Sequence, residues 1–420
     1  MTMNNKIWFS QFHLVGFAIM FFTGFSNPII AQKFVIPVFP DTQTEVHVKM
    51  DMFNSQMNWI VQHKDSLNVP FVLHVGDIVN YDNITHWQNA SNGFAILDQA
   101  NIPYAVCLGN HDTEAVGENS GSAAPGNTRL NLRKTTKFNT YFPVSRFPAQ
   151  KGRYETRKSD NAFYTFDAGG LKWLVLSLEF CARQGPVNWA DSVVSEYPGF
   201  NIIVLTHYHL GSAGDISTSN AGYGDLSPYT IYNQFIKKHA NIILVLSGHL
   251  MTSAWRNDIG DNGNHIYQLL QDYQDQDYGG GYLRLLEIDT KLKTISAKMY
   301  SPYYNITKQD ASIVQFTGVK FIDDSTPIPQ VRATELKNIL IYPNPAKTNQ
   351  DITVKVQGMN DDELIGAQLS VYSVQGALVN YSNKVEQLNL VSLPPVAGLY
   401  MGKVSTANGI GYFFKTVVLK

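Results

Sequence analysis

Five short apolar runs in the first two thirds of the chain each lead directly into residues that can bind a metal ion. Continuous runs of Val, Ile and Leu are typical of strands that are covered on both faces of an α/β sheet. The carboxyl ends of parallel strands meet at one edge of such a sheet, where ligands bind. The five segments are Asp41-Thr42-Gln43 after FVIPVFP, Gly76-Asp77 after FVLHV, Gly109-Asn110-His111-Asp112 after YAVCL, His207 after NIIVLT, and Gly248-His249 after IILVLS. We therefore expect an α/β fold with one metal site at the strand ends.

The same pattern predicts the first elements of the fold. A helix is expected over residues 46–67, because its apolar residues recur at helical spacing. Residues 113–160 are polar and too long for an ordinary connection, so we expect a functional insertion that could cover the site. Strands are expected at residues 34–38, 71–75, 104–108, 171–178, 202–205 and 242–246.

Each metal-binding segment also has an ordinary structural interpretation. A single histidine at a strand end is more often a hydrogen-bonded structural residue, a single Gly-Asp is usually a turn, and Asn-His-Asp can cap a helix. Turns alone rarely give all five segments in this order, however. The metal site is therefore the favoured interpretation.

Taken together, the segments resemble the calcineurin-like metallophosphoesterase superfamily. Its signature is Asp-x-His, Gly-Asp, Gly-Asn-His-Asp/Glu, a single His and Gly-His-x-His. The resemblance covers about residues 34–302 and implies a four-layer α/β/β/α sandwich that hydrolyses phosphate mono- or diesters by metal-activated water. It implies that Asp77 bridges two metals, and that Asn110, His207 and His249 complete one of them. It also places His111 beside the metals, where it supports the departing oxygen.

The other metal position departs from the family pattern. The resemblance implies ligands at Asp41, Gln43, Asp77 and Met251, but Gln43 and Met251 stand where the family has histidines. An amide oxygen binds hard divalent ions, whereas a thioether is a poor ligand for them. We therefore expect one tight metal, either Mn, Fe or Zn, and a weaker second site, for which His209 is a candidate ligand. The alternative is a binding or surface protein on a catalytically weakened scaffold.

Several further residues are weaker candidates. Tyr273 or Gln274 could line the cleft, although a plain strand and turn explain that segment equally well. Cys107 and Cys181 are expected to be separate, with a bridge left open. Arg133, Lys134 and Lys137 could meet a substrate phosphate or form a solvated basic loop.

The N-terminus predicts export. Lys6 precedes an uncharged apolar run over residues 14–25, followed by Pro28 and Ala31, so we expect residues 1–31 to be a signal peptide cleaved after Ala31. No later run approaches the roughly 18 apolar residues of a spanning helix, so no transmembrane segment is expected in the mature chain. With 32 Lys and Arg against 34 Asp and Glu, we expect no nucleic-acid binding surface.

The C-terminus has a different composition. We expect a phosphoesterase domain at residues 33–317, a linker at residues 318–338 that contains DDSTPIPQ, and a small all-β sandwich at residues 339–420. YPNP at residues 342–345, LSVYSVQG, Gly398-Leu399-Tyr400 and the closing FFKTVVLK resemble the sorting domain of the type IX secretion system of Bacteroidetes. This implies that the type IX machinery is a partner and that the protein is secreted or on the cell surface. An ordinary adhesive β-sandwich is the alternative.

Overall fold

The computed structural model describes residues 32–118, 126–323, 338–357, 359, 364–374, 377–406 and 411–420. The chain divides into two compact units, Met1–Thr326 and Pro327–Lys420. The expected signal peptide lies outside the described residues, as does most of the expected linker. In the described part of the chain, no helix has both the length and the apolar character needed to cross a membrane.

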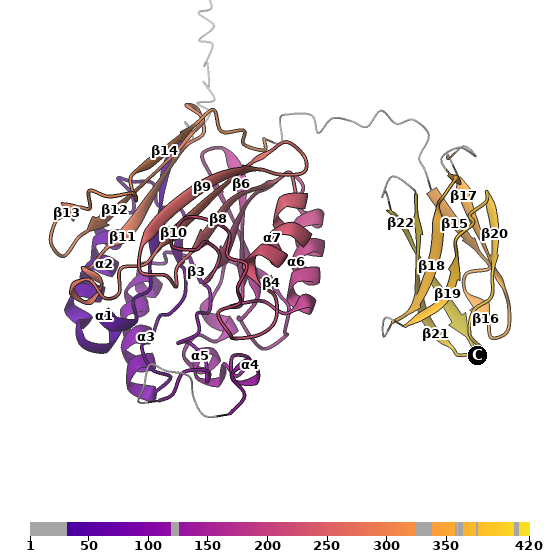
Figure 1. The fold of residues 1–420 in the computed structure, drawn as a ribbon, viewed down its shortest axis with the longest axis horizontal. Coiled ribbons are helices and arrows are strands. Elements are labelled where there is room, and N and C mark those ends of the chain that lie inside the picture. Colours follow the sequence, from indigo (N-terminus) through magenta and orange to yellow (C-terminus); the bar gives the residue numbers. More distant parts are fainter. Residues whose placement is uncertain are drawn as a thin grey trace, which may run out of the picture. The chain divides into compact units, whose positions relative to one another are not determined.

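The first sheet of the larger unit contains both the first and the last strands of that unit (Figure 1). β1, β2 and β3 run parallel, and β11 joins β1 in antiparallel register, with Lys33 opposite Asp289. The strand order is β13-β12-β11-β1-β2-β3, and β14 also pairs with β12. The strands are β1 (Lys33–Phe39), β2 (Val72–His74), β3 (Tyr104–Val106), β11 (Leu283–Asp289), β12 (Thr294–Ser301), β13 (Ile306–Thr307) and β14 (Val314–Thr317).

The second sheet has the order β4-β5-β6-β7-β8-β10-β9. Its middle strands, β6, β7, β8 and β10, are parallel, so their carboxyl ends lie at the same edge. The strands are β4 (Gln150–Arg153), β5 (Ala162–Ala168), β6 (Leu171–Leu178), β7 (Asn201–Thr206), β8 (Ile242–Ser247), β9 (Ser253–Ile259) and β10 (His265–Gln271).

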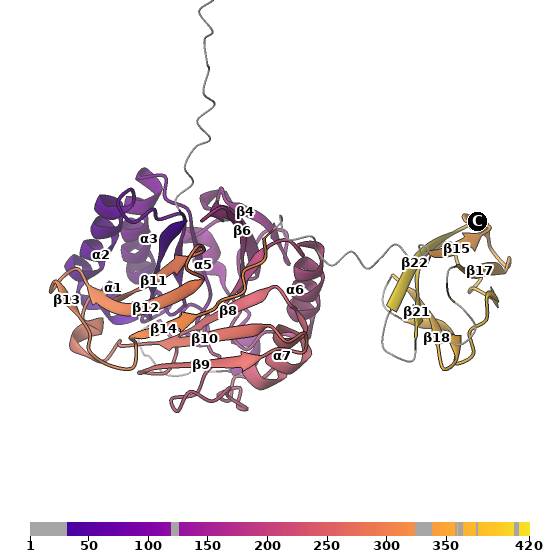
Figure 2. The same cartoon turned by 90° about the horizontal axis from the view of Figure 1, so that it is seen from above.

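The two sheets pack on each other, and helices cover their outer faces (Figures 1 and 2). Alternate residues of β6 show this arrangement: Trp173 and Val175 belong to the core between the sheets, whereas Leu174 and Leu176 pack on the helical side. This is the four-layer α/β/β/α fold expected from the sequence. The covering helices are α1 (Gln43–Val48), α2 (Met50–His63) and α3 (Ile84–Gln99) on the first sheet, and α6 (Gln184–Glu196) and α7 (Pro228–Gln234) on the second.

The expected helix over residues 46–67 is two helices, α1 and α2, divided at Lys49. Lys49 has φ −138° and ψ 51°, outside the helical region, and its backbone N–H bonds to the Glu45 carbonyl. Val46 and Phe53 are both fully buried, so the apolar pattern continues across the break. A pattern of buried residues cannot reveal a break at a position that carries a polar side chain.

The expected insertion is only partly separate from the body of the fold. Phe138, Phe142 and Phe147 are buried in the main core, where Phe138 and Phe142 pack against Trp87 of α3, so the second half of this segment stabilises the fold. Packing of these three aromatic rings outweighs the polar composition that suggested a cover. The segment contains α4 (Thr128–Asn131), α5 (Thr136–Tyr141), a 3₁₀ turn η1 (Val144–Arg146) and β4; two further 3₁₀ turns are η2 (Ile236–Lys238) and η3 (Asp277–Gly279).

The C-terminal unit is a β-sandwich. One sheet has the order β15-β17-β20 and the other β16-β22-β21-β18-β19. Alternate residues such as Val354 in β17 and Val371 in β18 are buried in one shared core. The strands are β15 (Asn338–Tyr342), β16 (Ala346–Lys347), β17 (Ile352–Gln357), β18 (Gln368–Ser373), β19 (Leu378–Ser382), β20 (Leu388–Val391), β21 (Gly398–Ser405) and β22 (Gly411–Leu419).

Candidate metal centre

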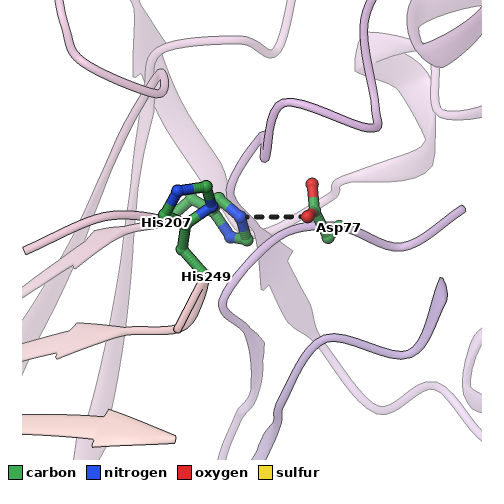
Figure 3. Close-up of side chains that lie close together, drawn as sticks. All are labelled: Asp77, His207 and His249. Atoms are coloured by element: carbon green, nitrogen blue, oxygen red, sulfur yellow. Dashed lines mark ion pairs between the residues drawn. The ribbon is translucent and has the colours of Figure 1, made fainter. Parts of the chain in front are cut away.

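Asp77 and His207 face each other between the two sheets of the larger unit (Figure 3). Asp77 follows β2 of the first sheet and His207 follows β7 of the second, and Asp77 Oδ2 lies 3.2 Å from His207 Nε2. His249, which follows β8, is the third member: the ligand atoms of the three residues lie within 4.8 Å of one another. Asn110 follows β3 and precedes His111, whose backbone N–H is bonded to Asp77 Oδ1 at 2.8 Å. We name Asp77, His207, His249 and the adjacent Asn110 the imidazole position.

Two glycines allow the turns that carry these ligands to touch. Gly76 has φ 102°, and a Cβ added there would lie 2.7 Å from the Gly109 N and 2.8 Å from His207 Nδ1. A Cβ added to Gly109 would lie 2.0 Å from Asp77 Oδ1. The glycines of the Gly-Asp and Gly-Asn-His-Asp motifs are therefore required by close packing, not only by turn geometry.

The backbone at two of the ligands is strained. Asp77 has φ 51° and His249 has φ 75°, both in the left-handed region that side chains other than glycine rarely adopt. Such residues persist where their surroundings hold them, and they concentrate at functional sites. His249 is held by a bond from its backbone N–H to Asp41 Oδ2 at 3.0 Å.

The hydrogen bonds of His207 determine what its second nitrogen can do. Its Nδ1 lies 2.9 Å from the Val75 carbonyl, which can only accept, so Nδ1 carries the proton. The lone pair of Nε2 then faces the Asp77 carboxylate, an arrangement that is favourable only with a proton or a cation between them. Burial alone would lower the pKa of His207, but the carboxylate raises it above its usual value. Burial would raise the pKa of Asp77, but the neighbouring His207 and His111 hold it well below its usual range.

Asn110 presents an oxygen without a donor. Its Oδ1 is buried and has no hydrogen-bond partner among the described residues. This buried, unpaired oxygen suits a cation.

His111 is held by two bonds and keeps one nitrogen free. Its backbone N–H donates to Asp77 Oδ1 at 2.8 Å, and its Nδ1 lies 2.7 Å from the Asn80 carbonyl. Because a carbonyl only accepts, the ring must donate from Nδ1. Nε2 of this half-buried ring is thus the atom that can exchange a proton with a ligand.

Asp112 has a structural role beside the centre. Its Oδ1 accepts from the Ile78 and Val79 N–H groups at 2.8 and 3.2 Å, and its Oδ2 accepts from the Gly109 N–H at 2.9 Å. These bonds tie the turn after β2 to the turn after β3. Burial, together with the charge of Asp77, raises the pKa of Asp112 to about 8.

A second group of oxygen donors lies next to the imidazole position. Asp41 follows β1, is 1% exposed, and has its Oδ2 3.8 Å from His207 Nε2. Gln43, the first residue of α1, is buried, and its Oε1 has no hydrogen-bond partner in the part of the chain described. Asp41, Gln43 and the shared Asp77 form what we name the carboxylate position. Its atoms are those that hard divalent ions prefer.

Two residues considered for this position do not join it. Met251 is 53% exposed, so its side chain lies largely in solvent. The suggestion that His209 completes the position is not supported, because its Nε2 is bonded to Gln268 Oε1 of β10 at 2.6 Å. His209 lies beyond the end of β7, and burial lowers its pKa to about 4.

The three basic residues of the insertion each pair with a carboxylate: Arg133 and Lys137 are partly buried, whereas Lys134 is solvated, as the loop interpretation allows. Arg133 is also bonded to the Phe180 and Cys181 carbonyls at 2.9 and 2.7 Å. Its guanidinium thus stabilises the fold. The ion pairs are Arg133 with Asp225 (2.9 Å) and Glu179 (3.3 Å), Lys134 with Glu114 (3.5 Å), and Lys137 with Asp82 and Glu118 (both 3.0 Å).

Of the remaining weak candidates, Tyr273 has another role, whereas Gln274 Oε1 is buried without a hydrogen-bond partner among the described residues. Tyr273 is 1% exposed and donates to Asp310 Oδ2 at 3.0 Å, so its ring packs in the interior and does not line a cleft. The backbone N–H of Gln274 donates to Asp272 Oδ1 at 3.0 Å. Cys107 and Cys181 are both buried and free, as expected.

Sequence reasoning missed Asp272 as a candidate ligand. It directly follows β10, as His207 follows β7, and it is fully buried with its Oδ2 lacking a hydrogen-bond partner among the described residues. The signal that could have found it is the same strand-end pattern. Two glutamines in the preceding run, HIYQLLQ, interrupt that pattern.

Comparison with known proteins agrees with this geometry. The model of the family described as calcineurin-like phosphoesterase matches residues 38–253, and that of the secretion system C-terminal sorting domain matches residues 340–420. An uncharacterized protein of Bacillus subtilis (strain 168), YvnB, is 29% identical over 272 residues, which are 63% of this chain and 19% of that protein. The chain therefore spans about a fifth of the length of this curated relative.

Two solved structures match parts of this chain at low sequence identity. A purple acid phosphatase from yellow lupin (Lupinus luteus) seeds has a TM-score of 0.42 and 14% identity, over 68% of this chain and 54% of that one. The NAD nucleotidase of Haemophilus influenzae has a TM-score of 0.38 and 14% identity, over 79% of this chain and 54% of that one.

Proposed function

Because the chain belongs to the calcineurin-like phosphoesterase family, we propose that it is an exported, metal-dependent enzyme that hydrolyses phosphate mono- or diesters. The observation that carries this proposal is the pair of acceptors at the imidazole position, where the Nε2 lone pair of His207 faces Asp77 Oδ2 at 3.2 Å. The buried, unpaired Oδ1 of Asn110 adds a third acceptor with no donor. A divalent cation satisfies all three atoms at once.

The donor set indicates which ions fit. Two imidazoles, a carboxylate and an amide oxygen suit Mn²⁺, Fe or Zn²⁺, and the described residues of the cluster contain no thiolate of the kind that holds structural zinc. Bound metal supplies an activated water near neutral pH and positive charge for the phosphoryl oxygens. Asp77, Asn110, His207 and His249 would hold the ion at the imidazole position.

The protein's own residues supply orientation and a proton. The bond from His207 to the Val75 carbonyl fixes the ring so that Nε2 points towards Asp77. His111 donates through Nδ1 to the Asn80 carbonyl, so its protonated form carries its exchangeable proton on Nε2. In this mechanism His111 gives that proton to the departing oxygen of the ester, and Asp77 keeps the imidazolium in place through the His111 backbone N–H.

The test uses the full chain with p-nitrophenyl phosphate and bis-p-nitrophenyl phosphate, each assayed with Mn²⁺, Zn²⁺ and Fe. We expect turnover with at least one ion and bound metal by elemental analysis. His265→Asn is a matched control, because His265 begins β10 at the end of the strand opposite the centre, so its loss should leave activity unchanged. Metal bound without turnover would favour the alternative, a binding protein on this scaffold. Absence of both metal and turnover would contradict the proposal.

The C-terminal sorting domain implies export through the type IX system and attachment at the cell surface. We propose that residues 1–31 are the signal peptide for the first membrane, residues 33–317 are the catalytic domain, and residues 339–420 direct export without taking part in catalysis. The metal ligands all lie in the larger unit, and the smaller unit has its own buried core. A domain with its own core can be removed without unfolding the rest.

Deletion from residue 339 onward tests the role of the tail. We expect the purified truncated protein to hydrolyse the same substrates at the same rate, and the truncated chain to stay in the periplasm of its native host. A truncated protein that still reaches the medium or the cell surface would contradict the sorting role. Loss of activity in a folded truncated protein would show that the tail serves catalysis.

A further inference from the structure

Asp272 lies at the same edge of the second sheet as the histidines of the imidazole position. β10 pairs with β8 in parallel, with Leu270 opposite Ser247, so the residues that follow these two strands emerge side by side. Asp272 follows β10 directly, and its backbone N–H is bonded to the Thr252 carbonyl at 2.9 Å. The preceding residue, Gln271, donates to the Val38 carbonyl at 3.1 Å, which brings this strand end to that of β1, just before Asp41.

Three buried carboxylates end at this edge of the two sheets. Asp41 Oδ2 lies 3.8 Å and Asp77 Oδ2 lies 3.2 Å from His207 Nε2. Asp272 is fully buried at the adjoining end of β10. Such groups persist when they coordinate a metal or share protons.

Asp272 and Gln43 each have a side-chain oxygen that accepts no hydrogen bond. Asp272 Oδ1 accepts from the Gln274 N–H, but Asp272 Oδ2 has no hydrogen-bond partner among residues that the structure describes. The same holds for Gln43 Oε1. Both side chains are more than nine-tenths buried, so solvent does not satisfy these oxygens. A buried acceptor without a donor is costly, and a cation removes that cost.

We propose that Asp272 is a metal ligand that completes the carboxylate position together with Asp41, Gln43 and Asp77. This rests on the proposed function, in that the imidazole position holds the first metal. The family has a histidine ligand at the position of Met251. Here Asp272 would bind the ion in its place, from the end of β10. Three carboxylates and an amide favour a hard ion such as Mn²⁺ or Mg²⁺, whereas the imidazole position suits Zn²⁺ or Fe. The second site is therefore changed in ion preference and not simply weakened.

The test compares Mn²⁺ binding to the full chain, to Asp272→Asn and to a control, by calorimetric titration and by elemental analysis after gel filtration. Asp275→Asn is the matched control, because it removes the same charge from an exposed residue three positions further along the same loop. We expect two Mn²⁺ per chain in the wild type and in the control. Asp272→Asn should keep the first ion and bind the second at least about 10-fold more weakly.

Thermal unfolding of the metal-free protein separates ligation from a structural role. Asn keeps an oxygen for the Gln274 N–H but removes the repulsion with Asp41 and Asp77, so Asp272→Asn should unfold at the same or a higher temperature than the wild type. Asp112→Asn is the contrasting variant, because that carboxylate accepts three backbone N–H bonds, and its replacement should lower the unfolding temperature.

The outcomes distinguish this inference from the proposed function. One Mn²⁺ in an active wild type, or two ions bound equally well by Asp272→Asn, would overturn the role of Asp272 and leave the enzyme intact. A lower unfolding temperature for metal-free Asp272→Asn, with unchanged metal binding, would show that Asp272 is only structural. A wild type without metal or turnover would overturn both proposals.

Discussion

The imidazole position and the carboxylate position share Asp77 but are built differently. At the imidazole position, the Asp77 and His249 backbones are strained and His207 is fixed by a carbonyl, so its geometry is set before an ion arrives. At the carboxylate position, Gln43 Oε1 has no partner in the described chain, and neither has Oδ2 of the proposed ligand Asp272. With metal bound as proposed, the first position would select an ion by geometry, and the second by charge and by the hardness of its oxygens.

The largest expected effect comes from breaking the imidazole position. His207→Ala removes a fully buried ligand and leaves Asp77 without its partner. Because a bound metal contributes several kcal/mol to phosphoryl transfer, kcat should fall by at least about 1,000-fold. Steady-state assays with elemental analysis check this, and His265→Ala is the control. A variant that keeps its metal and more than a tenth of its activity would show that the ion is held elsewhere.

Replacing His111 should cost less and should depend on the substrate. His111→Ala removes the free Nε2 but no ligand, so metal content should stay the same. Loss of a general acid typically costs about 100-fold or more. We expect that loss for alkyl phosphates and a smaller one for p-nitrophenyl phosphate, whose leaving group is a stable anion. Equal losses for both substrates would show that His111 acts by positioning and not by protonation.

Gln43→His should make the two positions more alike. The change replaces a buried amide oxygen with a nitrogen donor at the start of α1. Zn²⁺ affinity at the carboxylate position should rise about 10-fold relative to Mn²⁺, because imidazole suits zinc better than an amide does. Competition titrations of the two ions measure this ratio. If the ratio does not change, Gln43 is not among the ligands.

The smallest expected effect is that of Met251→Ala. Met251 is 53% exposed and its thioether is a poor ligand for hard ions, so metal stoichiometry should not change. Like other surface substitutions, it should change stability by less than about 0.5 kcal/mol. Loss of the second ion in this variant would show that Met251 moves onto the metal.

Most of the imidazole position could be predicted from the sequence. Asp77, Asn110, His207 and His249 each follow an apolar run, and the strand ends bring them to one edge as expected. Whether they hold metal stays a prediction. Local sequence could not show the break at Lys49, because it falls at a polar position between buried residues.

Asp272 was harder to identify for a physical reason. The strand before it contains Gln268 and Gln271, both fully buried, which bond with His209 and with the Val38 carbonyl. Glutamines that are satisfied inside a sheet remove the apolar signal on which strand prediction relies. The role of Arg133 could not be predicted for a related reason, because its carboxylate partners, Glu179 and Asp225, lie in later parts of the chain.

The contact between Asp77 and His207 bears on how slowly the folded protein unfolds. The His207 bond to Val75 already joins the two sheets across 132 positions of the chain, and an ion between His207 and Asp77 would act there as a removable cross-link. Because such a link must break before the sheets separate, metal loading would slow unfolding as well as enable chemistry. With export as proposed, the protein would be beyond the reach of chaperones, and its resistance to proteases would then depend on the supply of metal outside the cell.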